Sequence, residues 1–297
     1  IFDTTRGAGK LLYSDSTTSE QTDSSTITGT ASDGFTLGDD SGGYDVNTNS
    51  RTFVAWQWKA NGGTTASNSS GTNITSTVQA NTTAGFSIVT FTGTGNDGDS
   101  YGHGLSSAPE LVFPKKRSGT SNWQGYFFSS DGEDSQYFYL NLNNTFANTS
   151  GNSAASSSSV ITTDGSGDSN PSGGTVVSYC FHSVKGYSKI GRYTGNGSTD
   201  GPFIYTGFKP AWLMIKRSDS TSEWHIWDNK REDYNGNPNN TASRANNNNA
   251  ESDSTDYSID FLSNGFKLRN ASNLDNASSS TQVYMAFAEN PFVSSEG

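Results

Sequence analysis

Thr175-Val-Val-Ser-Tyr-Cys-Phe181 aligns without gaps to Thr52-Phe-Val-Ala-Trp-Gln-Trp58 and to Thr281-Gln-Val-Tyr-Met-Ala-Phe287. Successive side chains of a β-strand point to opposite faces of its sheet. One face of every copy then carries only large apolar side chains, and the other face carries a smaller, mixed set. The pattern predicts three copies of one core strand, each inside a sandwich of its own. The large faces are Val54, Trp56 and Trp58; Val177, Tyr179 and Phe181; and Val283, Met285 and Phe287.

The sequence around this strand repeats as well. Gly85-Phe86-Ser87 returns as Gly186-Tyr187-Ser188, at an offset of 101 residues (186 minus 85). A fixed period of this kind indicates an array of similar modules rather than one enzyme built around one cleft. Further matches at that offset are Pro109 with Pro210, Lys115-Lys116 with Lys216-Arg217, and Trp123 with Trp224.

Short alternating runs bounded by Asn, Asp, Gly and Ser predict β-strands throughout, and no stretch has the period of a long amphipathic helix. Apolar strands are expected after the prolines, at 111–113 and 212–215, each followed by a hairpin partner at 123–128 or 224–227. Pro114 cannot donate a ladder hydrogen bond, so it predicts that its strand lies at a sheet edge or ends there. We therefore predict an all-β fold of tandem antiparallel β-sandwich (jelly-roll-like) modules of about 100 residues.

Residues 1–61 match only the back half of the repeated unit. Ile1-Phe2-Asp3 resembles Ile226-Trp227-Asp228, and Asp33-Gly34-Phe35-Thr36-Leu37 resembles Asn264-Gly265-Phe266-Lys267-Leu268. We expect the front half upstream, in a neighbouring chain, or missing, and a truncated module leaves an unpaired sheet edge. Ile1 is not an initiator Met, so we expect a fragment or a processed product. The predicted units are the C-terminal part of a first β module at 1–61 (module one), a linker or first strand at 62–84, module two at 85–185 and module three at 186–297.

The composition favours several small aromatic cores over one large core. Only 30% of the 297 residues are hydrophobic, yet 12% are aromatic. Because each large ring buries roughly 150–250 Å², the rings supply most of the apolar area. The single cysteine, Cys180, cannot form an intrachain disulfide and is expected to be a small packed residue.

The formal net charge of −11 disfavours two kinds of partner. Nucleic-acid binding depends on clustered Lys and Arg, and attraction to anionic lipid also needs positive charge. No run of about 18 or more apolar residues is present, so we expect no membrane insertion. No secretory signal is visible either.

No pattern predicts a catalytic or metal site, and no cofactor is expected. His103, His182 and His225 lack a second His or Cys at metal-ligand spacing, so we expect solvated or hydrogen-bonded histidines. A Ser-His-Asp triad stays open, because its members need not be close in sequence. Acidic clusters between expected strands favour turns, and calcium binding by Asp164-Gly-Ser-Gly-Asp168 is a less favoured alternative. The clusters are Asp97/Asp99, Asp131/Glu133/Asp134 and Asp164/Asp168.

Three other patterns have both a structural and a functional interpretation. The basic runs Lys115-Lys116-Arg117 and Lys216-Arg217 are expected to make ion pairs within or between modules. The Gly-rich stretches 92–95 and 194–197 lack the Lys and the helix of a phosphate loop, so they predict strand-end turns. Some aromatic side chains suit core packing, which we favour, or stacking on sugar rings. They are Tyr101, Trp123, Trp224 and Tyr234.

The most distinctive stretches are Phe2-Asp-Thr-Thr-Arg-Gly-Ala-Gly9, Phe53-Val-Ala-Trp-Gln-Trp-Lys-Ala60, Thr83-Ala-Gly-Phe-Ser-Ile-Val-Thr90, Leu262-Ser-Asn-Gly-Phe-Lys-Leu268 and Tyr284-Met-Ala-Phe-Ala-Glu-Asn-Pro-Phe292. Through them the chain resembles structural, tail-fibre-like proteins of marine tailed bacteriophages, which carry such modules, often in tandem. The likeness covers most of the chain. Module two departs from it, because Phe127-Phe128-Ser129-Ser130 replaces Asp228-Asn-Lys-Arg231.

The resemblance implies an extracellular virion component of a tail fibre or related appendage, with no catalytic residues to carry over. By analogy with phage fibres it implies a homotrimer, contacts with other virion proteins, and a host-surface glycan as ligand, whose binding residues stay unassigned. Two other classes stay open. One is a purely architectural subunit of an extracellular filament or capsid decoration. The other is a polysaccharide-degrading enzyme, which needs two carboxylates roughly 5–10 Å apart.

Overall fold

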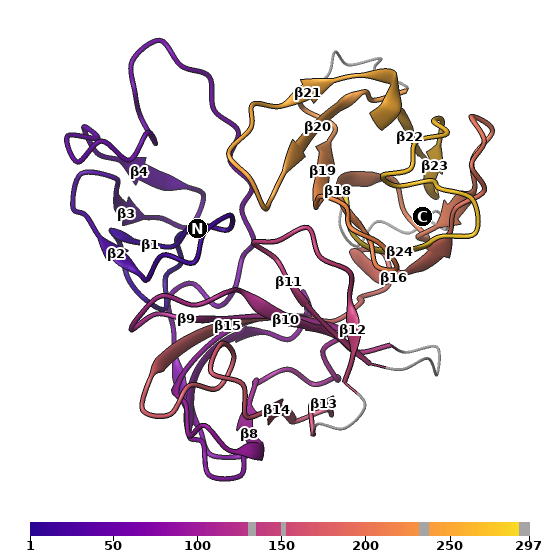
Figure 1. The fold of residues 1–297 in the computed structure, drawn as a ribbon. Coiled ribbons are helices and arrows are strands. Elements are labelled where there is room, and N and C mark those ends of the chain that lie inside the picture. The colour runs from indigo at the N-terminus through magenta and orange to yellow at the C-terminus, as the bar shows by residue number, and fades with distance from the viewer. Residues whose placement is uncertain (130–134, 150–152, 232–237, 291–297) are drawn as a thin grey trace.

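Short strands joined by Gly-, Asn- and Ser-rich turns build the molecule (Figure 1). The computed structural model describes residues 1–129, 135–149, 153–231 and 238–290. Within these ranges the 3₁₀ turn η1 (Thr255–Tyr257) is the only helix, and the sheets are built from antiparallel strand pairs. The predicted all-β fold of antiparallel β-sandwiches is confirmed.

Module two pairs a large sheet with a small one. Their facing sides enclose a buried cluster that includes Phe91, Tyr101, Ile161 and Cys180. The large sheet has the strand order β12 (Ala147–Asn148), β11 (Gln136–Tyr139), β10 (Gln124–Phe127), β9 (Leu111–Lys116), β15 (Thr175–Phe181), β7 (Phe86–Thr92), β6 (Ser76–Asn81) and β5 (Ala66–Asn68). The small sheet has the order β13 (Ala155–Ser156), β14 (Val160–Asp164) and β8 (Asp97–Gly102).

Module three repeats this strand order once β5 and β6 are set aside. Its own buried cluster includes Leu213, Trp227, Phe266 and Tyr284. The large sheet has the order β16 (Ser188–Thr194), β24 (Thr281–Ala288), β18 (Pro210–Arg217), β19 (His225–Asp228), β20 (Thr241–Arg244) and β21 (Ser252–Asp253). The small sheet has the order β17 (Phe203–Tyr205), β23 (Gly265–Leu268) and β22 (Ile259–Leu262).

Part of the segment 62–84 extends the large sheet of module two. β6 pairs with β7 from Ser76 opposite Phe91 to Asn81 opposite Phe86, and β5 pairs with β6 in turn. β16, the counterpart of β7, has β24 as its one strand neighbour among the described residues. Residues 66–68 and 76–81 of this segment are therefore strands of that sheet.

The predicted core strand is central in modules two and three. β15 lies between β7 and β9, and β24 lies between β16 and β18. The prediction that β9 is at an edge or ends at Pro114 is wrong, because β9 continues to Lys116 and Pro114 lies opposite Ser178 of β15. β10 pairs with β9 only at Leu111 and Val112, so among the described residues that side of the strand has no ladder partner at Pro114 and tolerates the missing N–H.

Module one contributes four short strands and an extended segment. β1 (Lys10–Leu11) pairs with β2 (Gln21–Thr22), and β3 (Ile27–Thr30) pairs with β4 (Phe35–Leu37). The third predicted core strand is wrong, because residues 52–58 form no strand. Its counterparts β15 and β24 each lie between two strands from the front half of their module. Residues 1–51 contain no counterpart of those front-half strands, and 52–58 pairs with no strand among the described residues.

The large apolar faces meet in one place instead of filling three separate sandwiches. Residues of both β15 and β24 belong to one buried cluster, the central core, against which Trp56 and Trp58 pack. The prediction that each large face fills a sandwich of its own is therefore wrong, and the smaller faces line the sandwich interiors instead. Alternation separates the two faces of a strand but does not tell which partner covers each face. The large-face members of the central core are Val177, Tyr179, Phe181, Val283, Met285 and Phe287.

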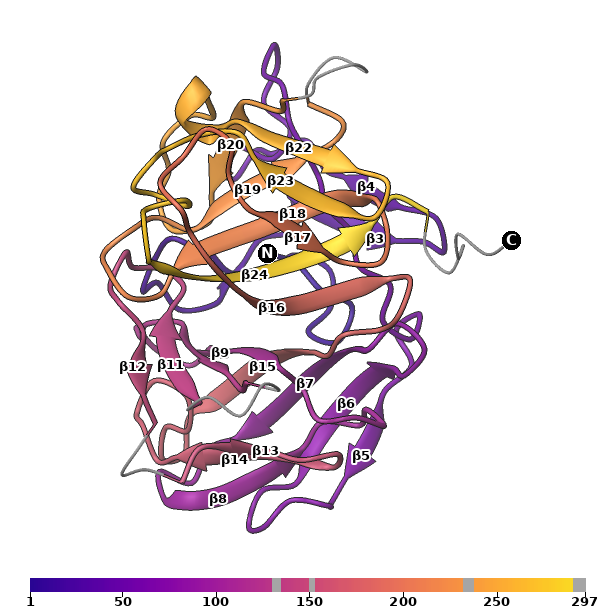
Figure 2. The ribbon, with the colours of Figure 1, turned by 90° about the vertical axis from the view of Figure 1, so that its right-hand side faces the viewer.

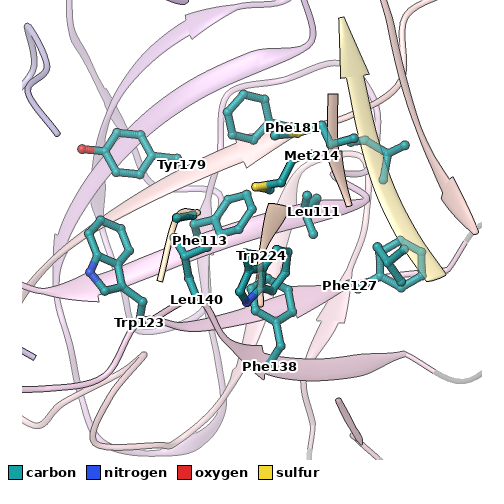
Figure 3. Packing of buried hydrophobic residues seen from close by; sticks show 14 of the residues in the cluster. Leu111, Phe113, Trp123, Phe127, Phe138, Leu140, Tyr179, Phe181, Met214 and Trp224 are labelled. Carbon is teal, nitrogen blue, oxygen red and sulfur yellow. The ribbon is translucent and has the colours of Figure 1, made fainter. Parts of the chain in front are cut away.

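Aromatic rings dominate the contact between modules two and three. Figure 2 shows the large sheet of module three above the large sheet of module two. In Figure 3, Met214 and Trp224 of module three lie among Phe113, Phe138 and Phe181 of module two. The ring centroid of Trp224 is 4.8 Å from that of Phe138 and 6.4 Å from that of Phe113. The two large sheets therefore form the two walls of one shared core.

Candidate functional site

The junctions between modules repeat the same hydrogen bonds. Trp123 Nε1 donates to the carbonyl oxygen of Tyr13 at 2.8 Å, and Trp224 Nε1 donates to that of Tyr139 at 3.3 Å. Each tryptophan contacts the preceding module, so the two have related surroundings. A second equivalent pair joins the amide N–H of Ser121 to Thr17 O and that of Ser222 to Asn143 O, both at 2.9 Å.

Contacts around the central core close a ring of three modules. Tyr179 Oη of module two donates to Asp3 Oδ2 of module one at 2.6 Å. Trp56 Nε1, from the matching position of module one, donates to Asp228 Oδ2 of module three at 3.1 Å. Module two thus contacts module one, module one contacts module three, and module three contacts module two. In the third equivalent pair, the residue matching Tyr179 and Trp56 is Met285, and the residue matching Asp3 and Asp228 is Phe127. Both are apolar and belong to the central core.

A shallow groove lies where module three meets the β11–β12 hairpin of module two. Its volume is about 280 Å³. β11 alternates, so Tyr137 and Tyr139 face the groove while Phe138 between them is buried in the central core. The two tyrosine rings are 6.1 Å apart at 79°. The lining residues are Tyr137, Tyr139, Asn144, Thr145, Ala147 and Thr221.

The repeated junction holds this groove in shape. In the turn between β11 and β12, the carbonyl oxygen of Asn143 accepts the amide N–H of Ser222. The amide N–H of Phe146 donates to the carbonyl oxygen of Ser218 at 2.8 Å. Both bonds join the hairpin to the β18–β19 turn that carries Thr221. Burial, with a smaller contribution from Asp168, raises the pKa of Tyr139, so its hydroxyl stays protonated at neutral pH.

The lining suits a neutral polar ligand with an apolar face. None of the six side chains is charged. The face of a tyrosine ring carries partial negative charge that attracts the C–H groups of a sugar ring. Amide and hydroxyl groups can donate to and accept from sugar hydroxyls. The groove therefore offers the chemistry of a glycan contact.

The aromatic residues singled out from the sequence do not form this groove. Tyr101, Trp123 and Trp224 are each only 1% exposed, so core packing, the favoured interpretation, is confirmed for them and sugar stacking is wrong. Tyr234 lies outside the described residues. Tyr137 and Tyr139 were missed. The alternation of side chains within 136–140 could have predicted that the two tyrosines share a face. The sequence does not indicate that module three lies beside that face.

The three histidines lie in different surroundings. His103 Nε2 lies 3.1 Å from the carbonyl oxygen of Ser157, and His182 Nδ1 lies 2.9 Å from that of Ser183, which confirms the expected hydrogen bonding. Burial lowers the pKa of His103 to about 4. The expectation is wrong for His225, which is buried with no hydrogen-bond partner for either ring nitrogen among the described residues. Burial lowers its pKa to about 3, so it is neutral.

Donors from the chain itself occupy the candidate carboxylates. The turn interpretation is confirmed for Asp168 but is wrong for Asp97 and Asp99, which lie in β8, and for Asp164, the last residue of β14. Asp99 accepts from Thr94 at 2.6 Å and from Asn73 at 2.7 Å, and these bonds lower its pKa. Asp164 accepts from Tyr126 Oη at 2.7 Å, and Asp168 accepts from Ser121 Oγ at 2.7 Å. The other members of these clusters are Asp97, which accepts from Ser153, and Asp131, Glu133 and Asp134, which lie outside the described residues.

The basic runs separate into ion-paired arginines and buried lysines. Arg117 pairs with Glu20 of module one at 2.7 Å, and Arg217 pairs with Asp219 at 2.7 Å, as expected. Lys115 and Lys216 are buried, and their ammonium groups donate to backbone carbonyls instead, so the ion-pair prediction is wrong for them. Burial lowers the pKa of both lysines to about 8. The turns after β7 and β16 are confirmed, with positive φ at Gly95 and Gly197.

Two features are absent from the part of the chain that the structure describes. No three His, Cys, Asp or Glu side chains gather there as a metal site. No helix there has the length and the apolar character needed to cross a membrane.

Comparison with known proteins places the chain in one family. Neither a curated protein nor a solved structure matches it. One family model matches residues 1–291, which is nearly the whole chain. The chain therefore belongs to the family described as Domain of unknown function (DUF7483).

Proposed function

We propose that this chain is a non-enzymatic structural protein of a virion, part of a tail fibre or related appendage, which contributes to attachment to a host-surface glycan. The tyrosine-lined groove is the observation that carries the attachment. It combines two ring faces with neutral amide and hydroxyl groups at a junction fixed by backbone hydrogen bonds.

The virion assignment is supported by the sequence resemblance to tail-fibre-like proteins of marine tailed bacteriophages. An extracellular fibre needs a stiff, soluble fold, and a molecule of antiparallel sheets with a shared aromatic core and a net charge of −11 suits that need. A homotrimer in contact with other virion proteins remains part of the proposal by analogy with phage fibres.

The non-enzymatic assignment is supported by the surroundings of the acidic residues. Glycoside hydrolysis uses two opposed carboxylates in a groove. Asp99, Asp164 and Asp168 instead accept hydrogen bonds from hydroxyl groups of the chain, those of Thr94, Tyr126 and Ser121, and none of the three aspartates lines the tyrosine groove.

A glycan array followed by titration calorimetry tests the attachment. We expect the native protein to retain a defined set of neutral or weakly charged glycans. Tyr139→Ala removes one ring of the groove and is expected to weaken binding at least about tenfold, about 1.4 kcal/mol. The matched control is Tyr205→Ala, which removes a tyrosine that is 65% exposed on β17, away from the groove, and should leave binding unchanged. An array with no retained glycan, or equal binding by Tyr139→Ala, contradicts the attachment.

The second candidate is a purely architectural subunit of an extracellular filament or capsid decoration. It is favoured by a different observation, the incomplete module one, whose apolar side chains are exposed. An image of the native assembly with head-to-tail contacts at module one would favour this candidate over the adhesive one.

A further inference from the structure

Module one exposes apolar side chains whose counterparts in module three are buried. Phe35 and Leu37 are 38% and 40% exposed, whereas their counterparts Phe266 and Leu268 are both 0% exposed. Of the seven exposed large hydrophobic side chains among the described residues, five lie in module one. The five are Ile1, Phe35, Leu37, Phe53 and Val54. Phe35 and Leu37, whose counterparts line the sandwich interior of module three, define the open face.

In module three, strands from the front half of the module cover Phe266 and Leu268, the counterparts of Phe35 and Leu37. β17 pairs with β23, placing Ile204 opposite Phe266. Tyr193 of β16 contacts the ring of Phe266, with centroids 6.0 Å apart. Leu213 of β18 belongs to the same buried cluster. All three side chains come from residues 186–217, for which module one has no equivalent.

The missing neighbours also explain the backbone of module one. β4, the counterpart of β23, pairs with β3 and has no second neighbour among the described residues, whereas β23 has both β22 and β17. Residues 52–58 lack the equivalents of both β16 and β18, which flank β24. A sheet edge with free N–H and C=O groups beside exposed apolar side chains is a template for strand addition.

An exposed turn of module three is a second, independent sign of the same partner. Asn246 Oδ1 accepts the amide N–H of Trp224, as Asn141 Oδ1 accepts that of Trp123. Two residues after Asn141, the carbonyl oxygen of Asn143 accepts the amide N–H of Ser222, which belongs to the front half of module three. Its counterpart two residues after Asn246 is Asn248, which is exposed. Three equivalent turns are therefore present, at Thr17, Asn143 and Asn248. Among the described residues, front halves dock on only the first two, those of modules two and three.

We propose that the open face binds a front-half segment of this same module type. Such a segment carries a strand like β16, an edge strand like β17 and a proline-led apolar strand like β18. The segment would pair with β4, flank residues 52–58 on both sides, and place its tryptophan turn against Asn248. This inference does not depend on glycan binding, because it concerns the assembly of the fold.

A fusion to the full chain tests the proposal. Residues 186–225 are copied in front of residue 1, so that the added His225 precedes Ile1 as the native His225 precedes Ile226. Hydrogen exchange is then measured by mass spectrometry on the fused and the native chain. Amide exchange in 34–38 and 52–58 is expected to slow at least about tenfold in the fusion, about 1.4 kcal/mol of added local stability.

The matched control carries Leu213→Asp and Ile215→Asp in the added copy only. These side chains are buried in module three, so the control segment should not dock and exchange in module one should stay at the native rate. Equal exchange in the native chain and the unsubstituted fusion would overturn the proposal. So would sedimentation showing a native oligomer in which 34–38 and 52–58 are already protected, because a second copy would then occupy the open face.

Discussion

Asp275 is a buried carboxyl group that its surroundings do not satisfy. Its Oδ2 accepts one hydrogen bond, from Asn270 Nδ2 at 3.4 Å, and its Oδ1 has no partner among the described residues. Burial raises its pKa to about 8. An aspartate in the unfolded chain titrates near about 3.9. Between about pH 4 and pH 8 the unfolded chain therefore binds fewer protons, and the contribution of this group to stability falls as pH rises.

Asp275→Asn should remove this pH dependence. We expect the variant to match the native protein below about pH 4 and to be more stable by roughly 1–3 kcal/mol at pH 8, the cost of an unsatisfied buried polar group. Urea unfolding at a series of pH values measures the difference. A native protein whose stability is no lower at pH 8 than at pH 5 relative to the variant would contradict the assignment.

Asp164→Asn is the matched control in module two. Asp164 is the last residue of β14 and, unlike Asp275, accepts several hydrogen bonds, from Gln124, Tyr126 and Ser169. An amide cannot accept from all of these donors, so this substitution should destabilise the protein at pH 7, opposite in sign to Asp275→Asn.

At the scale of elements, pairing decides what a strand sequence becomes. The copies at 175–181 and 281–287 became central strands, as their alternation predicted, because both neighbours are present. The copy at 52–58 has the same alternation and larger rings, yet it forms no strand. Local sequence specifies a strand's faces, but the hydrogen-bond partners come from elsewhere in the chain.

The sequence indicated those features of the site that depend on local residues, and missed those that depend on contacts between modules. The turn at Asp168 and the packing of Trp123 follow from local rules on turns and on aromatic burial. The groove does not, because Tyr139 and Thr221 are brought together by a junction between modules. The burial of Lys115 was also unpredictable, since Thr17, whose carbonyl oxygen accepts a hydrogen bond from the Lys115 ammonium group, belongs to module one.

Tyr179→Phe tests the contact between the central strand of module two and module one. The phenol donates to Asp3 and accepts from Arg6 Nη2 at 3.2 Å. Loss of these charge-assisted bonds should lower the free energy of unfolding by roughly 1.5–3 kcal/mol, because hydrogen bonds to charged groups are the stronger ones. Chemical denaturation measures the effect. A change below about 0.5 kcal/mol would mean that module one is not held through this contact.

At the scale of the whole molecule, three modules surround one core, and residues 1–61 supply the counterpart of only the back half of a module. Modules two and three share the central core, so we infer that they stabilise each other and unfold together. Module one contributes Trp56 and Trp58 to the same core while its own sandwich interior stays open. Full burial of a side chain such as Phe35 or Leu37 is worth roughly 1.5–3 kcal/mol. A docked front half would therefore stabilise the molecule substantially.

Residue-resolved hydrogen exchange of the native chain is the most direct test of this account, because it compares three copies of one sequence pattern in one molecule. The account predicts the slowest exchange at 175–181 and 281–287, the central strands, and exchange close to that of an unstructured chain at 52–58. Equal protection of all three copies would contradict it, since 52–58 would then have the strand partners that module one lacks.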